Sequence, residues 1–246
     1  AVIATDKGHI NVHETGAIEA TGHKVLAMPS KDGKLTPADV LKALDTHTDE
    51  HMVQPKMVYI SNSTEIGAQY SKADIEALHH ICRQNDLTLR DIAELVDVFY
   101  IGGTKAGALF GEALIICRDE LKQDYRFMIK QRGAMMAKGW LLGIQFEELF
   151  QNHLFYDMAA HSNDMASILR KGIEQCGYAF FSESMTNQLF PILPDAVIEA
   201  LSADFLFSIQ ERGTNGSSAI RLVTSWATRE DACHAFVAAL QNCKNK

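Results

Sequence analysis

The first half of the chain alternates short apolar segments of strand length with amphipathic segments of helix length. The sequences Thr36–Asp39 and Ser71–Asp74 each place a capping hydroxyl and an acid at the start of an expected helix. Strands separated by helices predict βαβ units and a mostly parallel sheet. Strands are expected at residues 1–4, 24–28, 57–61, 96–102 and 113–117.

The pattern changes near Tyr125. One long helical stretch is expected from there toward Ile173, and a final helix is expected from Arg229. Between them we expect strands at residues 178–182, 189–193, 205–209 and 220–224, and one short helix at residues 194–201. We therefore predict two domains: a large α/β domain over residues 1–125, and a connecting helix with a smaller α/β domain over residues 126–246.

Composition limits the class of protein. The 246 residues carry a net charge of −8, which disfavours a nucleic-acid partner. No apolar run approaches the roughly 20 residues that span a bilayer, and the opening residues lack the pattern of a signal peptide. The five cysteines are scattered, without a C-x-x-C pair, so we expect a reducing cytoplasm and no disulfide framework.

The most informative segment follows the expected strand 96–102. It reads Gly102-Gly103-Thr104-Lys105-Ala106-Gly107. Strand ends form ligand crevices in open α/β sheets, and glycines allow a ligand to approach closely. A partly desolvated lysine at such a place can form a Schiff base with a carbonyl group. The alternative is a surface lysine in an ordinary glycine turn.

Three further segments carry polar residues beside strands. His9 follows the first strand, and with His13 four residues later it could share a metal on a helix, although no third ligand is evident. The segment 59–67 is a strand followed by polar residues, which could simply cap their own backbone. Arg221 lies within an apolar strand, where it needs either a carboxylate ligand or an internal ion pair.

Taken together, these segments resemble the low-specificity L-threonine aldolase family, which are pyridoxal-phosphate enzymes of the aspartate-aminotransferase fold (fold type I). The matching stretches are GHINVHETGAIEATGHK, DGKLTPADV, ISNSTEIGAQYS, DLTLRDIAELVDVFYIGGTKAGALFGEAL and IRLVTSW. They cover nearly the whole chain, in the order that the family shows.

The resemblance implies a role for each candidate residue. Lys105 would form the Schiff base with pyridoxal 5′-phosphate, His9 would stack on its pyridine ring, and Thr104 would contact its phosphate. Arg221 would bind the substrate α-carboxylate, with Glu65 and Ser63 near the substrate hydroxyl. No metal is implied. The activity implied is cleavage of L-threonine or L-allo-threonine into glycine and acetaldehyde, by a homodimer or homotetramer. Another fold-type I lyase, acting by β-elimination, and an inactive homologue with a binding role are the alternatives.

The resemblance also implies that two parts of the family pattern are absent from the sequence. One is an N-terminal portion with the glycine-rich phosphate turn. The other is an internal strand whose aspartate pairs with the pyridine nitrogen, and the apparent junction lies between Gln84 and Thr88. We expect these segments to be missing from the sequence rather than from the folded enzyme, because a parallel sheet that loses an interior strand loses core and hydrogen bonds together.

Overall fold

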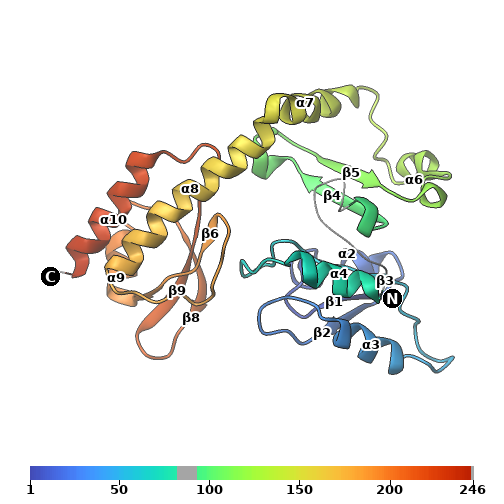
Figure 1. The fold of residues 1–246 in the computed structure, drawn as a ribbon, viewed down its shortest axis with the longest axis horizontal. Helices are drawn as coiled ribbons and strands as arrows, with labels where there is room; N and C mark the ends of the chain where they lie inside the picture. The colour runs from blue at the N-terminus through green and yellow to red at the C-terminus, as the bar shows by residue number, and fades with distance from the viewer. Residues whose placement is uncertain (82–92, 245–246) are drawn as a thin grey trace.

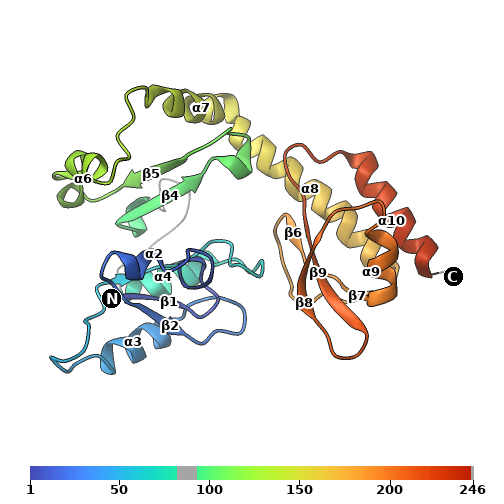
Figure 2. The ribbon, with the colours of Figure 1, turned by 180° about the vertical axis from the view of Figure 1, so that it is seen from behind.

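The computed structural model describes residues 1–81 and 93–244. They form an N-terminal lobe, a C-terminal lobe and an arm that connects them, with the long helix α8 (Leu154–Gln175) running from the arm into the C-terminal lobe (Figure 1). The view from behind shows the same arrangement (Figure 2). Within these residues, no helix combines the length and the apolar character that crossing a membrane requires. The expected junction between Gln84 and Thr88 lies outside the described residues.

The N-terminal lobe is built on a three-stranded parallel sheet. Its strands are β1 (Val2–Thr5), β2 (Val25–Met28) and β3 (Met57–Val58), in the order β2-β1-β3. The fully buried β1 is central, as expected for a strand covered on both faces. The predicted strand at 57–61 is shorter than expected, because only two residues pair with β1 and the chain then leaves the sheet.

Two helices complete the core of this lobe, and both begin where the sequence predicts. In α3 (Pro37–Asp45) and α4 (Lys72–His80), a capping box joins the N-cap hydroxyl to an aspartate three residues later. Two single-turn helices, α1 (His9–Val12) and α2 (Ala17–Ala20), follow β1. The core contains apolar residues from the sheet and from α3 and α4, such as Ile3, Leu26, Val40 and Leu78.

The strands β4 (Val98–Gly102) and β5 (Glu112–Ile116) do not join the parallel sheet. They pair with each other as an antiparallel hairpin. The reason is the short connection, since a parallel pair needs a crossover of a dozen or more residues. The hairpin lies in the arm, above the three-stranded sheet in the view of Figure 1.

The prediction of a single long helix from residue 125 is wrong. The chain instead forms α6 (Tyr125–Gln131), α7 (Trp140–Phe150) and α8. Between α7 and α8, Asn152 and His153 adopt left-handed φ angles of 50° and 62°, which end one helix and start the next. One short 3₁₀ turn, η2 (Asp119–Leu121), precedes α6, and another, η3 (Gln151–His153), lies between α7 and α8.

The C-terminal lobe packs α8, α9 (Asp195–Leu201) and α10 (Glu230–Lys244) against an antiparallel sheet. The strand β9 (Ser217–Val223) pairs with each of the other three, which are β6 (Gln188–Leu189), β7 (Ile192–Pro194) and β8 (Ser208–Arg212). The helices at 195 and 230 begin as predicted. The prediction of a strand at residues 178–182 is wrong, because that segment makes only an isolated bridge, from Phe180 to Pro191.

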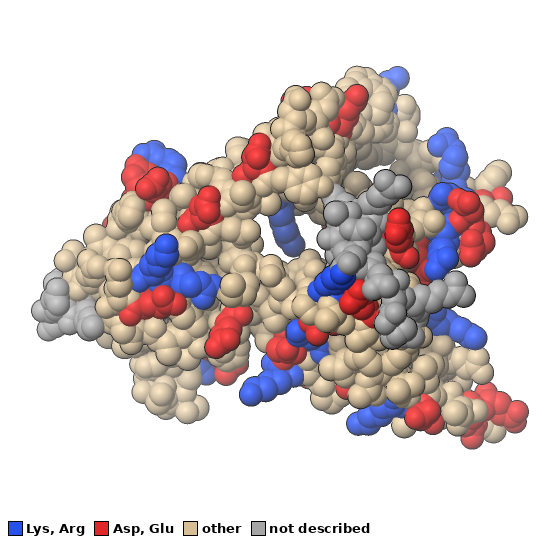
Figure 3. Space-filling model, in the orientation of Figure 1, with Lys and Arg blue, Asp and Glu red and all other residues tan. Residues whose placement is uncertain are grey.

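Two separate apolar cores result. One is made by residues 3–95 and the other by residues 165–240. The arm between them contributes to neither core, and the domain boundary at residue 125 stays a prediction. The space-filling view shows that the surface is hollowed below α8, between the two lobes (Figure 3).

Candidate active site

His9 is the centre of a cluster of ionisable side chains at the end of β1. Its ring lies between two carboxylates, with Nδ1 3.0 Å from Glu65 Oε1 and Nε2 2.9 Å from Glu14 Oε1. Glu14 comes from the turn after α1, whereas Glu65 comes from the loop that follows β3. The hydrogen bond to Glu65 and the close contact with Glu14 orient the imidazole from both of its nitrogens.

His13 extends this cluster toward solvent. Its Nε2 lies 3.8 Å from Glu65 Oε2, and its ring centroid lies 5.2 Å from that of His9 at an angle of 49°. Among the described residues, no set of three or more His, Cys, Asp or Glu side chains is arranged to hold a metal ion. The shared metal considered for His9 and His13 is therefore not supported by the described residues.

The loop carrying Glu65 connects the three parts of the molecule. On one side Tyr59 forms a 2.9 Å hydroxyl–hydroxyl hydrogen bond with Tyr100 of β4. On the other side Ser182 Oγ donates a 2.7 Å hydrogen bond to Ile66 O, which joins the loop to the C-terminal lobe. Glu65 and Tyr59 also line a small pocket with Lys7, Gly8 and Thr64. Ser63 lies in the same loop, half-buried.

Burial above all raises the pKa of the Tyr100 hydroxyl well above its usual range. The hydrogen bond with Tyr59 acts in the same direction, and so do the negative charges of Glu112 and Glu14. Tyr100 therefore stays protonated beside the acidic cluster. This places β4, which leads to Lys105, within electrostatic reach of Glu14.

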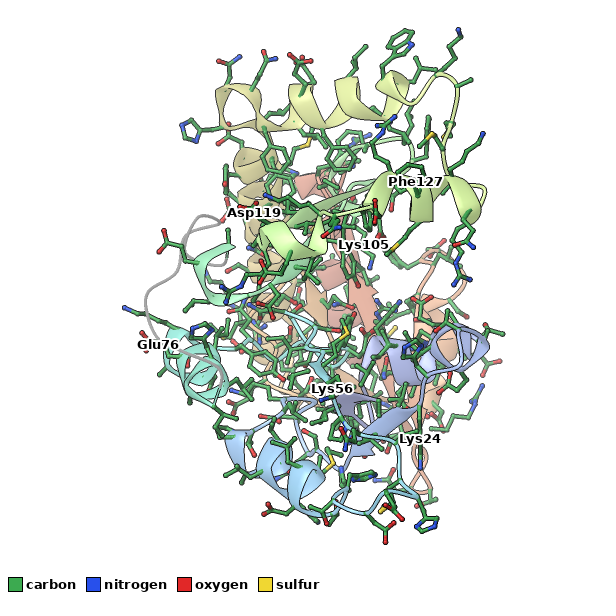
Figure 4. All side chains as sticks on the ribbon, turned by 90° about the vertical axis from the view of Figure 1, so that its right-hand side faces the viewer. Lys24, Lys56, Glu76, Lys105, Asp119 and Phe127 are labelled. Carbon is green, nitrogen blue, oxygen red and sulfur yellow. The ribbon has the colours of Figure 1, made fainter. Side chains whose placement is uncertain are left out.

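Lys105 lies in the 3₁₀ turn η1 (Thr104–Ala106) directly after β4. The turn ends at Gly107, whose φ of 96° is in the left-handed region that glycine adopts without strain. Both Thr104 and Lys105 are exposed, and no hydrogen bond or ion pair from the described residues reaches Lys105 Nζ. In Figure 4 Lys105 lies in the arm, above the three-stranded sheet.

Arg221 belongs to β9 in the C-terminal lobe. Its Nε and Nη2 donate hydrogen bonds of 2.9 and 2.6 Å to the same oxygen of Gln188, on the neighbouring strand β6. The internal ion pair considered from the sequence is therefore not formed with any described acid. A half-buried guanidinium held by a neutral amide keeps its full positive charge, so it is suited to a carboxylate ligand.

The structure thus brings together His9, Glu65, Glu14 and His13. Among the described residues, no hydrogen bond or ion pair joins Lys105 and Thr104 in the arm, or Arg221 in the C-terminal lobe, to this cluster, although the loop at 59–67 bonds to both of those parts. Tyr59 and Tyr100 were missed by the sequence analysis. One tyrosine directly after β3 and one in the middle of β4 carry no pattern that would have paired them.

These residues fit pyridoxal phosphate and an amino-acid substrate. For the cofactor, Lys105 supplies an amine without a hydrogen-bond or ion-pair partner among the described residues, and His9 supplies a ring oriented by its contacts with Glu65 and Glu14. For the substrate, Arg221 supplies a cation that no described acid neutralises.

Comparison with known proteins shows the family of the chain. A family model described as beta-eliminating lyase matches residues 1–196. A threonine aldolase from Leishmania major superposes with a TM-score of 0.96 at 52% identity, covering 99% of this chain and 77% of that structure. A low-specificity L-threonine aldolase from Pseudomonas sp. (strain NCIMB 10558) is 27% identical over 94% of this chain and 72% of its own length.

More distant structures share the architecture. A putative aromatic amino acid beta-eliminating lyase/threonine aldolase from Exiguobacterium sp. 255-15 superposes with a TM-score of 0.71 at 12% identity, covering 98% of this chain and 75% of that one. At that identity the likeness shows the fold alone. The fold-type I architecture and the resemblance found in the sequence are both confirmed. The chain therefore belongs to the beta-eliminating lyase family.

Proposed function

We propose that the chain is a pyridoxal-phosphate-dependent aldolase that cleaves L-threonine or L-allo-threonine into glycine and acetaldehyde. The observation that carries the proposal is the environment of Arg221, whose charge is left uncompensated by the amide of Gln188. An α-amino acid substrate offers the carboxylate that this guanidinium lacks. The similarity to threonine aldolases supports the choice of a β-hydroxy-α-amino acid.

Each side chain has a separate task in this proposal. Lys105 would hold the cofactor covalently through its amine, and Thr104 would donate a hydrogen bond to the phosphate. The ring of His9 would stack on the pyridine. When bound, pyridoxal phosphate supplies an electron sink for the pair released at the substrate Cα. Arg221 would orient the substrate by its carboxylate, so that the bond to be broken is correctly placed.

A base near the substrate hydroxyl is also needed, because breaking the Cα–Cβ bond requires removal of the hydroxyl proton. Glu65 and Ser63 are the side chains that we place there. In the structure Glu65 Oε1 already forms a hydrogen bond with His9 Nδ1. Glu65 would therefore act on the substrate through His9, or by its second oxygen.

The products identify the reaction. Purified chain is incubated with pyridoxal phosphate and L-threonine, and acetaldehyde and 2-oxobutanoate are measured separately. Aldol cleavage gives acetaldehyde and an equal amount of glycine, whereas β-elimination gives 2-oxobutanoate and ammonia. A borohydride-reducible adduct without either product would identify a homologue that binds the cofactor but is inactive.

We also infer that the chain assembles as a homodimer or homotetramer and works in the cytoplasm. The arm exposes large apolar side chains that a second copy could cover, among them Leu109 (86% exposed), Phe127 (75%) and Trp140 (60%). The cysteines at 117, 176, 233 and 243 are free thiols, as suits a reducing compartment. Light scattering after gel filtration measures the assembly, and a monomer would contradict it.

A further inference from the structure

The segment 182–188 of the C-terminal lobe bonds to the loop of Glu65 at its first residue and to Arg221 at its last. Glu65 follows β3 in the N-terminal lobe and Arg221 belongs to β9, and the two lobes have separate apolar cores. A β-hydroxy-α-amino acid carries its hydroxyl and its carboxylate on adjacent carbon atoms. A site that binds both groups therefore needs a contact that fixes one lobe against the other.

Glu65 and Ile66 form the tip of a tight turn. The N–H of Gly67 donates a 2.9 Å hydrogen bond to Thr64 O, which closes the turn. At its base, Thr64 Oγ1 donates a 3.0 Å hydrogen bond to Asp32 O. The base of the turn is therefore fixed to the N-terminal lobe.

The tip of the turn is held from the C-terminal lobe. Ser182 Oγ donates a 2.7 Å hydrogen bond to Ile66 O. Ser184 is buried against Gly67 so closely that a Cβ on this glycine would have no room. Arg170 of α8 donates from Nη2 to Ser184 O, which ties the segment to the long helix. The turn thus has one anchor in each lobe.

The same segment continues to the partner of Arg221. Ser184 Oγ lies 3.0 Å from Thr186 Oγ1, and Thr186 Oγ1 accepts a 3.2 Å hydrogen bond from Gln188 N. Gln188 Oε1 then accepts the two hydrogen bonds of Arg221. One short segment, with its own internal hydrogen bonds, therefore contacts both the turn of Glu65 and the guanidinium of Arg221.

We propose that the segment 182–188 positions Glu65 relative to Arg221, and that the hydroxyl of Ser182 is the positioning group. It holds the tip of the turn, so that Glu65 stays within reach of the hydroxyl on the substrate Cβ while Arg221 holds the carboxylate on Cα. Ser182 acts through the backbone of Ile66 and not on the substrate. The inference deepens the proposed function and rests on it for the identity of the substrate, whereas the link between the two lobes can be measured without substrate.

The first test is amide hydrogen exchange of the purified chain, measured by mass spectrometry with and without pyridoxal phosphate. Ser182→Ala removes the donor to Ile66 O, so residues 62–68 and residues 184–188 should both exchange several-fold faster. Ser182→Thr keeps the hydroxyl and should restore the original rates. Unchanged exchange at residues 184–188 in Ser182→Ala would overturn the positioning role of the segment.

The matched control is Ser202→Ala. Ser202 Oγ also donates a 2.7 Å hydrogen bond to a backbone carbonyl, that of Glu199, but it lies at the end of α9 and outside the segment. Its loss should leave the exchange of residues 62–68 and 184–188 at the original rate. Faster exchange of both segments in Ser202→Ala would assign the effect to a general loss of stability and overturn the role of Ser182.

The second test separates positioning from a merely structural role, in the chain loaded with pyridoxal phosphate. The quantities measured are kcat and KM for L-threonine and the inhibition constant of glycine, with kcat counted per borohydride-reducible adduct so that unfolded chains do not contribute. Ser182→Ala should lower kcat several-fold, and Ser182→Thr should restore it. The inhibition constant of glycine should not change, because glycine offers Arg221 a carboxylate but has no hydroxyl for Glu65.

Two kinetic results would overturn the proposal. One is an unchanged kcat in Ser182→Ala, or a loss that affects glycine as much as L-threonine. The other is a loss that Ser182→Thr does not restore, which would assign the effect to packing rather than to the hydroxyl. A chain that releases no acetaldehyde but shows linked exchange of residues 62–68 and 184–188 would retain the positioning role and contradict only the aldolase activity.

Discussion

Arg221 donates two of its guanidinium hydrogen bonds, from Nε and Nη2, to a single oxygen of Gln188. This neutral acceptor fixes the plane of the guanidinium without cancelling its charge. The pair crosses from β9 to the strand beside it, since Gln188 pairs with Val223 in the sheet. The direction of the cation is therefore set by backbone pairing rather than by another charge.

Replacing Gln188 with Glu should weaken substrate binding, because a carboxylate at this position would pair with Arg221 and compete with the substrate.

Arg221→Ala should lower kcat/KM by about 10- to 100-fold, the effect of losing charge-assisted hydrogen bonds worth ~1.5–3 kcal/mol. Steady-state kinetics with L-threonine measures both. The control for Gln188→Glu is Gln210→Glu, on the exposed side of β8. Unchanged kinetics in Arg221→Ala would make this arginine merely structural.

Lys105→Ala should abolish the covalent adduct with pyridoxal phosphate and all turnover, since no other side chain can replace the amine in the turn after β4. Absorption spectra and intact mass after borohydride reduction measure the adduct. Lys138→Ala removes an exposed lysine from the arm and should retain the adduct. A Lys105→Ala chain that still forms a reducible adduct would place the Schiff base elsewhere.

Gly67→Ala should destabilise the fold far more than Gly22→Ala. Both glycines have left-handed φ angles, of 81° and 82°, so both substitutions incur about 1–2 kcal/mol of backbone strain. A Cβ at residue 67 would lie 2.3 Å from Ser184 Oγ and 2.5 Å from Ser184 Cβ, whereas one at residue 22 meets nothing within 4 Å. We expect a further loss of about 1–3 kcal/mol for Gly67→Ala, measured by urea unfolding. Equal losses would contradict the close contact between the loop and the C-terminal lobe.

The stability of the chain should fall between pH 10 and about 12. Burial raises the pKa of Tyr70 to about 12, with the Leu35 N–H that donates to its hydroxyl acting in the opposite direction. In the unfolded chain this tyrosine ionises near its usual value of about 10, so its contribution is complete below that pH and is lost as pH rises through the folded value.

The loss due to Tyr70 is about 2–3 kcal/mol, which corresponds to a raised pKa of roughly two units. Unfolding by urea at a series of alkaline pH values measures it. Tyr70→Phe should flatten the decline, because the ionisable hydroxyl is gone. Tyr156→Phe, which alters an exposed tyrosine, should leave the decline as it is in the original chain. The same slope in both variants would show that Tyr70 does not carry the effect.

The sequence predicts well those elements whose signals are local. The helices at residues 37 and 72 begin where Thr36 and Ser71 predict, because a capping box needs only four consecutive residues. Lys105 was singled out for a similar reason, since a glycine-flanked turn at a strand end is visible in a short segment.

Features that depend on distant contacts were missed. The break at Asn152 and His153 carries no proline or glycine, and an apolar period that continues across it resembles one helix. The hairpin of β4 and β5 looks like two strands of the parallel sheet until their short connection is considered. The partner of Arg221 could not be found either, because the choice between an acid and Gln188 depends on the pairing of β6 with β9.

The two left-handed residues between α7 and α8 act as a pivot in the geometry of the site. Beyond them α8 has 22 residues, and at 1.5 Å per residue it is about 33 Å long. A rotation of only about 5° at its start would displace its far end by about 3 Å, the length of a hydrogen bond. The torsion angles of Asn152 and His153 therefore help to set the distance from Lys105, in the arm, to Arg221, in the lobe that α8 enters.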